Sequence, residues 1–315
     1  MTRVVLIAGG VGGAKMAEGF AALDVDLTVI GNVADDEEFH GLWVSPDIDT
    51  MLYTLSGRIN RDQGWGVADE GRRALDTLTE LGVDTWMFLG DRDFGLHIYR
   101  AERLRRGDRP SDITADIARA FGVGPRIALP TDDRVQTRVR TDAGWLSFQE
   151  YFVRERCAPE VRELRYDGLA EARPTAEALD ALTSADLIVI APSNPLVSIA
   201  PILGVTGLSA AVRAAPASVM AVSPLIAGKV VKGPADRMMA ALGMRADAVG
   251  VAERYAGLAD TLVIDNADVA LAQDISALGI TPAVTDIMMP DAAGKARLAG
   301  EILAAWQTAQ AGRAA

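Results

Sequence analysis

Short runs of β-branched and aliphatic residues recur along the chain and alternate with segments of helical periodicity. The runs that predict strands are Arg3–Ala8, Asp26–Ile30, Thr85–Leu89, Asp186–Ala191, Ser218–Val222, Ala248–Ala252 and Thr261–Ile264. Because continuous apolar runs of this kind are buried on both faces, they indicate a mainly parallel sheet with helices on both faces. We therefore expect a Rossmann-like α/β fold whose ligand site lies at the carboxyl ends of the strands.

Two stretches depart from this alternation. Residues from about 50 to 122 predict a helical subdomain, with helices over Thr50–Leu55, Val67–Leu81, Leu96–Leu104 and Ser111–Phe121. Residues from about 126 to 166 alternate between apolar and polar positions, which predicts a small antiparallel hairpin with Ala143-Gly144 near its turn. We expect residues 1–315 to form one unit that carries both additions.

Charge and cysteine content narrow the class of protein. The 31 Lys and Arg residues face 43 Asp and Glu, a formal net charge of −12, which argues against nucleic acid and anionic membrane surfaces as partners. Cys157 is the single cysteine, so no internal disulfide can form, and His40 and His97 are too few for a zinc cluster. No apolar stretch approaches the ~20 residues that span a bilayer. These features predict a cytoplasmic protein that acts on small molecules.

A glycine loop follows the first predicted strand and precedes a helix. It contains Gly9, Gly10, Gly12, Gly13 and Lys15. Glycines let the backbone approach a phosphate closely, and the N–H groups of the helix N-terminus meet its charge, so the loop predicts phosphate binding; the alternative is a simple tight turn. Neither the dinucleotide fingerprint nor the Walker pattern is complete, and Asn32 rather than an acid ends the second strand, which argues against a nicotinamide enzyme.

Carboxylates gather after the second predicted strand. Asp35 and Asp36 are followed by Asp47 and Asp49, which would point to the same side of an extended segment. Carboxylates together with substrate phosphate oxygens are the usual ligands of Mg²⁺, so these four residues are candidate metal ligands. Alternatively, the first pair belongs to a solvated loop and Asp49 caps the next helix.

Three further polar segments end predicted strands. Asp91, with Arg92, Asp93 and His97 close by, would hold phosphate or accept a hydroxyl proton, or would only begin an ion-paired helix. Ser193 and Asn194 suit both helix capping and phosphate or base recognition. Lys229 and Lys232 would form a basic lid over an anionic ligand, or are simply solvated.

The order of these motifs resembles one family. The segments Gly9-Gly-Val-Gly-Gly-Ala-Lys, Asn32-Val-Ala-Asp-Asp, Ser45-Pro-Asp-Ile-Asp-Thr, Leu89-Gly-Asp-Arg-Asp, Ala191-Pro-Ser-Asn-Pro and Ser223-Pro-Leu-Ile-Ala-Gly-Lys look like those of the 2-phospho-L-lactate transferases (CofD). The resemblance runs from Val4 to about Glu253. It implies an enzyme of coenzyme F-420 biosynthesis that uses Mg²⁺ and forms a homodimer. Such an enzyme moves a phospho-lactyl or related group from a guanosine diphosphate-linked donor to the ribityl hydroxyl of the deazaflavin Fo, and releases GMP.

The resemblance also implies roles for individual residues. The glycine loop and Lys15 would hold the donor diphosphate, Ser193 and Asn194 the guanosine nucleotide, and Asp35, Asp36, Asp47 and Asp49 the Mg²⁺ or the Fo hydroxyl. Asp49, Asp47 and Phe88 would contact Fo, although Phe88 replaces the lysine of archaeal relatives. Asp49 is the first candidate to accept the hydroxyl proton and Asp91 the second.

Two questions stay open at the level of sequence. No residue can be assigned to sensing whether the donor carries lactate, enolpyruvate or glycerate, because these differ by small groups at one carbon. A non-catalytic, nucleotide-binding CofD-like protein is the alternative to the enzyme, and the segments at Ser45 and Leu89 favour the enzyme.

Overall fold

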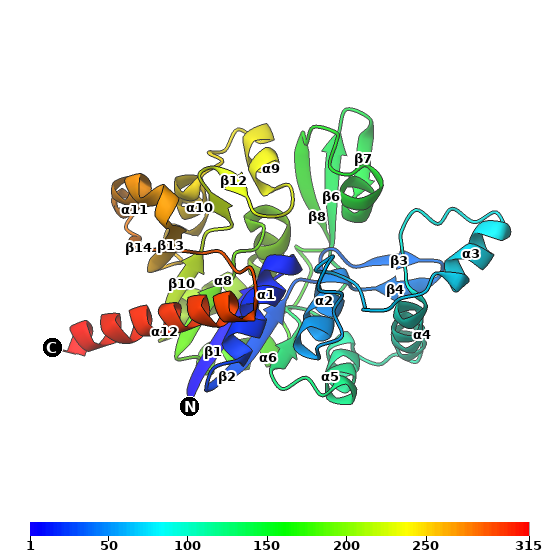
Figure 1. Ribbon diagram of the computed structural model, residues 1–315, viewed down its shortest axis with the longest axis horizontal. Coiled ribbons are helices and arrows are strands. Elements are labelled where there is room, and N and C mark those ends of the chain that lie inside the picture. Colours follow the sequence, from blue (N-terminus) through cyan, green and yellow to red (C-terminus); the bar gives the residue numbers. More distant parts are fainter. Residues whose placement is uncertain (315) are drawn as a thin grey trace.

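The computed structural model describes residues 1–314 and is built on a seven-stranded parallel sheet (Figure 1). The strand order is β14-β13-β10-β9-β1-β2-β5, and every neighbouring pair is parallel. The strands are β1 (Thr2–Ala8), β2 (Val25–Gly31), β5 (Arg126–Ala128), β9 (Leu187–Ile190), β10 (Ser218–Val222), β13 (Thr261–Asp265) and β14 (Thr281–Thr285). The chain leaves β1 toward β2 on one side and reaches β9 on the other, so the order reverses between β1 and β9. A ligand crevice is expected at that switch point.

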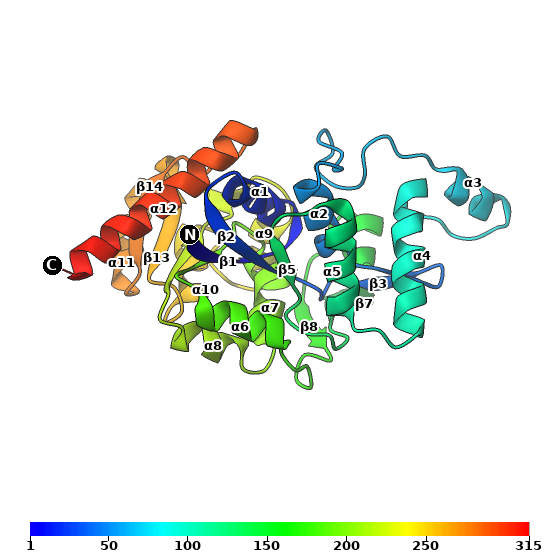
Figure 2. The same cartoon turned by 90° about the horizontal axis from the view of Figure 1, so that it is seen from below.

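Helices cover both faces of this sheet, as Figure 2 shows from below. One face carries α1 (Gly10–Ala21) and α12 (Ala292–Ala314), which share a core with β1 through Met16, Phe20 and Leu298. The other face carries α6 (Ala176–Ser184), α7 (Ala200–Gly204), α8 (Leu208–Ala214) and α10 (Ala248–Tyr255), which pack on a second, larger core. The expected Rossmann-like architecture with helices on both faces is confirmed.

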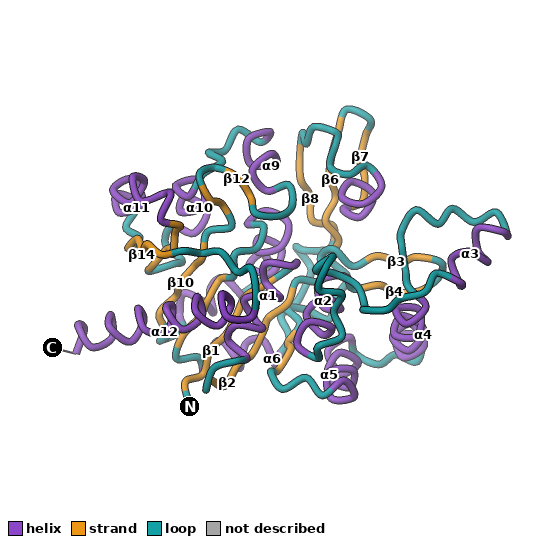
Figure 3. The backbone as a smooth tube through the Cα atoms, in the orientation of Figure 1, coloured by secondary structure: helices purple, strands orange, loops and turns teal. Residues whose placement is uncertain are grey.

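A helical region projects beyond the β5 edge. It contains α2 (Pro46–Leu55), α3 (Arg73–Glu80), α4 (Asp91–Arg105) and α5 (Pro110–Phe121), with the hairpin of β3 (Glu37–Phe39) and β4 (Leu42–Val44). Its own core includes Leu52, Leu96 and Ile113. Long loops flank α3 (teal in Figure 3). The helical subdomain expected at residues 50–122 therefore begins a few residues earlier, at Pro46.

A small antiparallel sheet follows β5. It has the order β7-β6-β8, formed by β6 (Gln136–Thr141), β7 (Gly144–Ser147) and β8 (Glu163–Asp167), and the π-helical turn η1 (Glu150–Arg154) follows β7. The turn between β6 and β7 lies at the predicted Ala143-Gly144, and β8 adds a third strand to the expected hairpin. The remaining elements are the π-helical turn η2 (Pro195–Ile199), β11 (Leu225–Ile226), β12 (Lys229–Val230), α9 (Ala235–Ala241), η3 (Asn266–Leu271) and α11 (Ala272–Ala277).

Two predicted strands are wrong. Ala248–Ala252 lies in α10, because Asp247 caps a helix by accepting a hydrogen bond from the Gly250 N–H at 2.9 Å. Thr85–Leu89 is a loop, in which Trp86 packs edge-on against Phe39 and no backbone pairing with a neighbouring strand forms among the described residues. Helix α3 covers only the second half of the helix predicted over Val67–Leu81, and β5 and β14 were not predicted as strands of the main sheet.

Within residues 1–314, no single helix combines the length and apolar character needed to cross a membrane. One bent pair, Pro195–Gly204 with Leu208–Ala214 at 84°, meets that test by length and composition. Ile199, Ile202 and Leu208 of this pair are buried in the larger core.

Replacing Gly12 with alanine tests the close contact at the switch point. A Cβ at Gly12 would collide with the Pro192 carbonyl oxygen, so the loops that follow β1 and β9 would have to separate. Helix propensity alone predicts a gain for this substitution, but we expect Gly12→Ala to lower the free energy of unfolding by about 1–3 kcal/mol, measured by urea denaturation.

Gly300→Ala is the matched control. Gly300 lies inside α12 and a Cβ there meets no heavy atom within 4 Å, so a gain of about 0.5–1 kcal/mol is expected. Equal effects of the two substitutions would show that the backbone contact at Gly12 is not tight.

Candidate active site

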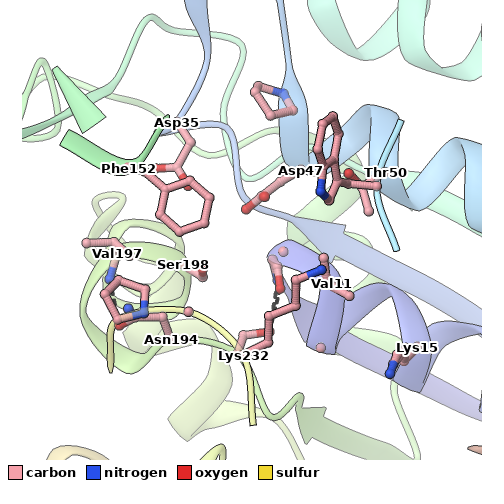
Figure 4. A pocket seen from close by; sticks show the side chains of 18 of the residues that line it. Val11, Lys15, Asp35, Asp47, Thr50, Phe152, Asn194, Val197, Ser198 and Lys232 are labelled. Atoms are coloured by element: carbon pink, nitrogen blue, oxygen red, sulfur yellow. Dashed lines mark hydrogen bonds between the residues drawn. The ribbon is translucent and has the colours of Figure 1, made fainter. Parts of the chain in front are cut away.

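A cavity of about 510 Å³ opens at the carboxyl edge of the sheet, at the switch point between β1 and β9 (Figure 4). The glycine loop, α2, η1, η2 and the segment after β12 all contribute to its lining. Of the residues predicted to form the site, ten line it: Gly9, Gly10, Gly12, Lys15, Asp35, Asp47, Asp49, Phe88, Ser193 and Asn194. Gly13, Asp36 and Asp91 do not.

The glycine loop is fastened directly to the segment that follows β9. Ser193 Oγ donates to the Gly9 carbonyl at 2.7 Å and accepts from the Gly9 N–H at 3.2 Å. Gly10 begins α1 with φ of +61°, a conformation that favours glycine. The N-terminus of α1 therefore borders the cavity, with the Gly10 N–H hydrogen-bonded to Asp47 and Lys15 on the same helix. A helix N-terminus at a cavity suits phosphate binding.

Asn194 is a cap residue that also borders the cavity. Its Oδ1 accepts from the N–H groups of Leu196 at 2.9 Å and Val197 at 3.4 Å, which caps η2, while the residue also lines the cavity. The Ser193 hydroxyl already donates to the Gly9 carbonyl, so Ser193 fixes the glycine loop rather than offering a free donor to a ligand.

Asp35 and Asp47 form the carboxylate pair of the cavity. Both are nearly buried, and Figure 4 shows their side chains directed toward the open space. Burial raises the pKa of Asp35 well above its usual range, with the charge of Asp47 adding to the effect. Burial also raises the pKa of Asp47 to about 6, although the Asn32 amide donates to its Oδ2 at 3.0 Å.

This pair fits a divalent cation. Asp35 Oδ1 is buried and has no hydrogen-bond partner, so a hard oxygen ligand is held ready at the cavity without a counter-charge. The backbone that carries it is fixed by the small sheet region, where Gln149 donates to the Asp35 carbonyl at 2.9 Å. No group of three or more His, Cys, Asp or Glu side chains gathers around one point within residues 1–314, so a cation here would need further ligands from a substrate.

Asp49 and Asp36 are placed differently from this pair. The expectation of an extended segment is wrong: Asp47 and Asp49 both lie in the first turn of α2, where residues two apart face different directions. Both oxygens of Asp49 accept from the buried Arg100, with Nη1 to Oδ2 at 3.1 Å. Asp36 lies beneath the cavity, where its Oδ2 accepts from Ser45 at 2.7 Å and Trp43 at 3.1 Å.

The start of α4 brings Asp93, not Asp91, to the cavity. Asp91 accepts from the Ala74 N–H and from Arg73, both at 3.0 Å, which is the ion-paired helix start considered above. Asp93 accepts from the Tyr53 hydroxyl at 2.6 Å, and burial raises its pKa to about 6. Burial lowers the pKa of the neighbouring His97 to about 4, so this histidine is neutral at pH 7.

Cations and aromatic rings complete the lining. Lys15 and Lys232 each donate to a backbone carbonyl, of Met289 at 3.1 Å and of Gln63 at 2.7 Å. Trp65, Phe88 and Phe152 line the cavity and each keeps more than a third of its surface exposed, so flat apolar faces are available to an aromatic ligand.

Several of these residues were missed at the level of sequence. Arg100 and Gln149 belong to a helix and a turn without motif character, and each meets its partner across more than 50 residues of chain. Asn32 was noted only as a departure from the nicotinamide pattern. For the two lysines after β10, the sequence left a basic lid and a solvated surface open. Lys232 lines the cavity, whereas Lys229 is 83% exposed and does not.

The fold and the cavity define a doubly wound α/β protein with a phosphate-type loop at its switch point. The family model of 2-phospho-L-lactate transferase CofD matches residues 4–293. The chain belongs to this family and is a transferase.

Relatives and solved structures agree with this assignment. A phosphoenolpyruvate transferase of Streptomyces griseus is 40% identical over 309 residues, 96% of this chain and 97% of the relative. A 2-phospho-L-lactate transferase of Methanopyrus kandleri is 39% identical over 306 residues, 96% of each chain. A crystal structure of a UPF0052-family protein (BH3568) of Bacillus halodurans shares the fold, with a TM-score of 0.62 at 16% identity over 96% of this chain and 98% of that one.

Removing the Arg100 charge tests the buried ion pair. The side chains of Arg100 and Asp49 are about 5% exposed, so Arg100→Met leaves Asp49 without its counter-charge. We expect the free energy of unfolding to fall by about 3–5 kcal/mol, and the double variant Asp49→Asn/Arg100→Met to lose clearly less than the sum of the single variants.

Arg103→Met is the control on the same helix. Arg103 pairs with Asp108 and Asp116 away from the cavity, and we expect a loss of about 1 kcal/mol or less. Additive single and double variants would contradict a direct coupling between Arg100 and Asp49.

The raised pKa of Asp93 gives stability a pH dependence of defined sign. The folded state holds this proton up to about pH 6, whereas an unfolded Asp releases it near pH 4, so the Asp93 contribution falls as pH rises between these values. Asp93→Asn does not titrate. Between pH 4 and pH 7, the free energy of unfolding of Asp93→Asn should therefore rise relative to that of wild type by on the order of 2–3 kcal/mol, measured by urea denaturation.

Asp91→Asn should show the opposite sign. Hydrogen bonds from Ala74 and Arg73 lower the pKa of Asp91, so the free energy of unfolding of wild type rises as this carboxylate ionises with increasing pH. Asp91→Asn lacks this rise, so its stability should fall relative to wild type as pH increases. Parallel pH profiles for both variants would contradict the assigned environments.

Proposed function

We propose that this transferase moves a phospho-carboxylate group from a guanosine diphosphate-linked donor to the ribityl hydroxyl of Fo, releasing GMP, in coenzyme F-420 biosynthesis. The observation that carries the proposal is the division of charge within one cavity. The glycine loop, the start of α1, Lys15 and Lys232 supply positive character, while Asp35, Asp47, Asp49 and Asp93 supply carboxylates. A diphosphate donor and a hydroxyl acceptor need these two environments side by side.

Mg²⁺ is the proposed cofactor, and Asp35 and Asp47 are the residues that would hold it. Asp35 Oδ1 is buried without a hydrogen-bond partner, and Asp47 lies against the glycine loop, where its carboxylate accepts from the Gly10 N–H. A cation held here would be shared between these carboxylates and phosphate oxygens bound at the loop. When bound, Mg²⁺ would neutralise charge on the diphosphate. Asp36 is less suited, because one oxygen is already held by Ser45 and Trp43 and it does not line the cavity.

The chain's own residues align the two reactants. The start of α1 and Lys15 would hold the donor diphosphate, and Asn194, which lines the cavity at the start of η2, would bind the guanosine part. Trp65, Phe88 and Phe152 offer faces for the deazaflavin ring system. The hydroxyl oxygen then forms a bond to the phosphorus of the transferred group while the bond from that phosphorus to the GMP oxygen breaks.

The hydroxyl proton passes to a carboxylate of the cavity. Asp49 remains the first candidate, and Arg100 holds its carboxylate in one orientation from below. Asp93 replaces Asp91 as the second candidate, because Asp93 lines the cavity and Asp91 does not. A homodimer is part of the family expectation, and every residue named for this arrangement belongs to one chain.

A turnover assay tests the proposal. Purified protein is incubated with Fo, Mg²⁺ and, in turn, the lactyl, enolpyruvyl and glyceryl phosphate donors linked to guanosine diphosphate. We expect GMP and a phosphodiester of Fo in equal amounts with at least one donor. The relatives named for lactate and for enolpyruvate have nearly equal identity to this chain, so all three donors are needed. Binding of GDP with no turnover and no Fo fluorescence change would instead identify a non-catalytic nucleotide-binding relative.

Asp49→Asn tests the acceptor side of the site. The amide cannot accept a proton and leaves Arg100 without its counter-charge, so we expect turnover at saturating Mg²⁺ and donor to fall by about 10²–10⁴-fold. The Asp91→Asn variant serves as the control and should keep near-normal turnover. Near-normal turnover of Asp49→Asn would overturn its assignment.

A further inference from the structure

Lysine is scarce in this chain, and its distribution is uneven. There are four lysines, Lys15, Lys229, Lys232 and Lys295. Lys295 is paired with Glu18 at 2.6 Å and Lys229 lies 3.8 Å from Asp236. The other two line the cavity and have no carboxylate partner within the described part of the chain. In a protein with a net charge of −12, two unpaired ammonium groups in one cavity point to an anionic ligand.

Lys232 is held in place by a contact between two loops. Its Nζ donates to the Gln63 carbonyl at 2.7 Å, which joins the segment after β12 to the loop that carries Trp65. Figure 4 shows Lys232 approaching the open space from the side opposite Asp35 and Asp47, whereas Lys15 lies on α1 to one side. Two of the three Lys232 N–H bonds remain for a ligand. Burial and the charge of Lys15 both lower the pKa of Lys232, a cost that a bound anion would offset.

The two lysines need not serve the same anion. The proposed donor carries a diphosphate and, on the transferred group, a separate carboxylate. The α1 N-terminus and Lys15 lie together and account for the diphosphate. The carboxylate belongs to the transferred group, beyond the phosphorus that the acceptor hydroxyl attacks. Lys232 reaches the open space across from Asp35 and Asp47 and is the second lysine of the lining, so it is the cation left for the carboxylate.

We propose that Lys232 binds the carboxylate of the transferred group and thereby selects donors that carry an acid. The inference rests on the proposed function and assigns one of its substrate contacts. An ammonium group is a point charge without the fixed fork of a guanidinium. It therefore reads the presence of a carboxylate rather than the shape of the adjoining carbon, so lactyl, enolpyruvyl and glyceryl donors should depend on Lys232 alike.

The test combines a protein variant with a substrate variant. Lys232→Met and wild type are assayed with the best natural donor and with an analogue whose carboxylate is replaced by a methyl group. For the natural donor, kcat/KM should fall by about 10- to 100-fold in Lys232→Met. For the analogue, which wild type should already use poorly, the substitution should change kcat/KM by less than about threefold. The dissociation constant of GDP should change equally little.

Matched variants separate this role from a general effect of charge or folding. Lys229→Met removes a lysine from the same segment, and wild-type kinetics are expected because Lys229 is 83% exposed and outside the cavity. Lys232→Arg keeps the charge and should retain part of the activity toward the natural donor. Equal melting temperatures of Lys232→Met and wild type would exclude loss of fold.

Three results would overturn the inference. If Lys232→Met weakens GDP as strongly as the donor, Lys232 is a diphosphate ligand. If the analogue loses as much as the natural donor, no carboxylate contact exists. If Lys232→Met and Lys232→Arg both match the kcat/KM of wild type with an active donor, Lys232 has no role, while the proposed function stands. Wild type without turnover on every donor would overturn the proposed function itself, and the inference with it.

Discussion

Compensation of buried charge is the constraint on which the site depends. Asp35, Asp47, Asp49 and Asp93 border one cavity, and carboxylates held this close in a partly dry environment repel one another. Within residues 1–314, a cation of the protein pairs with only one of them, namely Arg100 with Asp49. Burial raises the pKa values of Asp35, Asp47 and Asp93, so the charged forms of these carboxylates are not compensated by the protein's own cations. A ligand that brings both a cation and phosphates would complete the charge balance of the cavity, which is what the proposed reaction supplies.

The sheet topology brings the opposing charges to one place. Because the order reverses between β1 and β9, the two loops that follow these strands meet, and Ser193 fastens them through Gly9. The positive end of α1 then lies beside the first turn of α2, which carries Asp47 and Asp49. Elements added to the core fold supply the rest: α4 provides Asp93 and Arg100, and the small sheet region provides Gln149. The additions therefore serve the site as well as extending the fold.

Local patterns in the sequence were enough for the fold class, the glycine loop and the acidic segments, because each depends on neighbouring residues. Five of the seven predicted strands are present for the same reason. The errors lie where a local pattern is compatible with two structures. The apolar run at Ala248 forms a helix because Asp247 caps its start, and Thr85–Leu89 is held by side-chain packing rather than by strand pairing. The choice between Asp91 and Asp93, and the role of Arg100, depend on contacts between distant segments, such as Tyr53 with Asp93. A single sequence does not specify those contacts.

The most direct test of charge completion is a calorimetric titration of GDP into the protein with and without Mg²⁺. If Asp35 and Asp47 hold a cation shared with the diphosphate, Mg²⁺ should tighten GDP binding by about tenfold or more, which corresponds to about 1.4 kcal/mol of coupling. In Asp35→Asn/Asp47→Asn this effect should shrink to less than about twofold, because the shared ligands are gone. GDP affinity that is the same with and without Mg²⁺ in wild type would contradict the account.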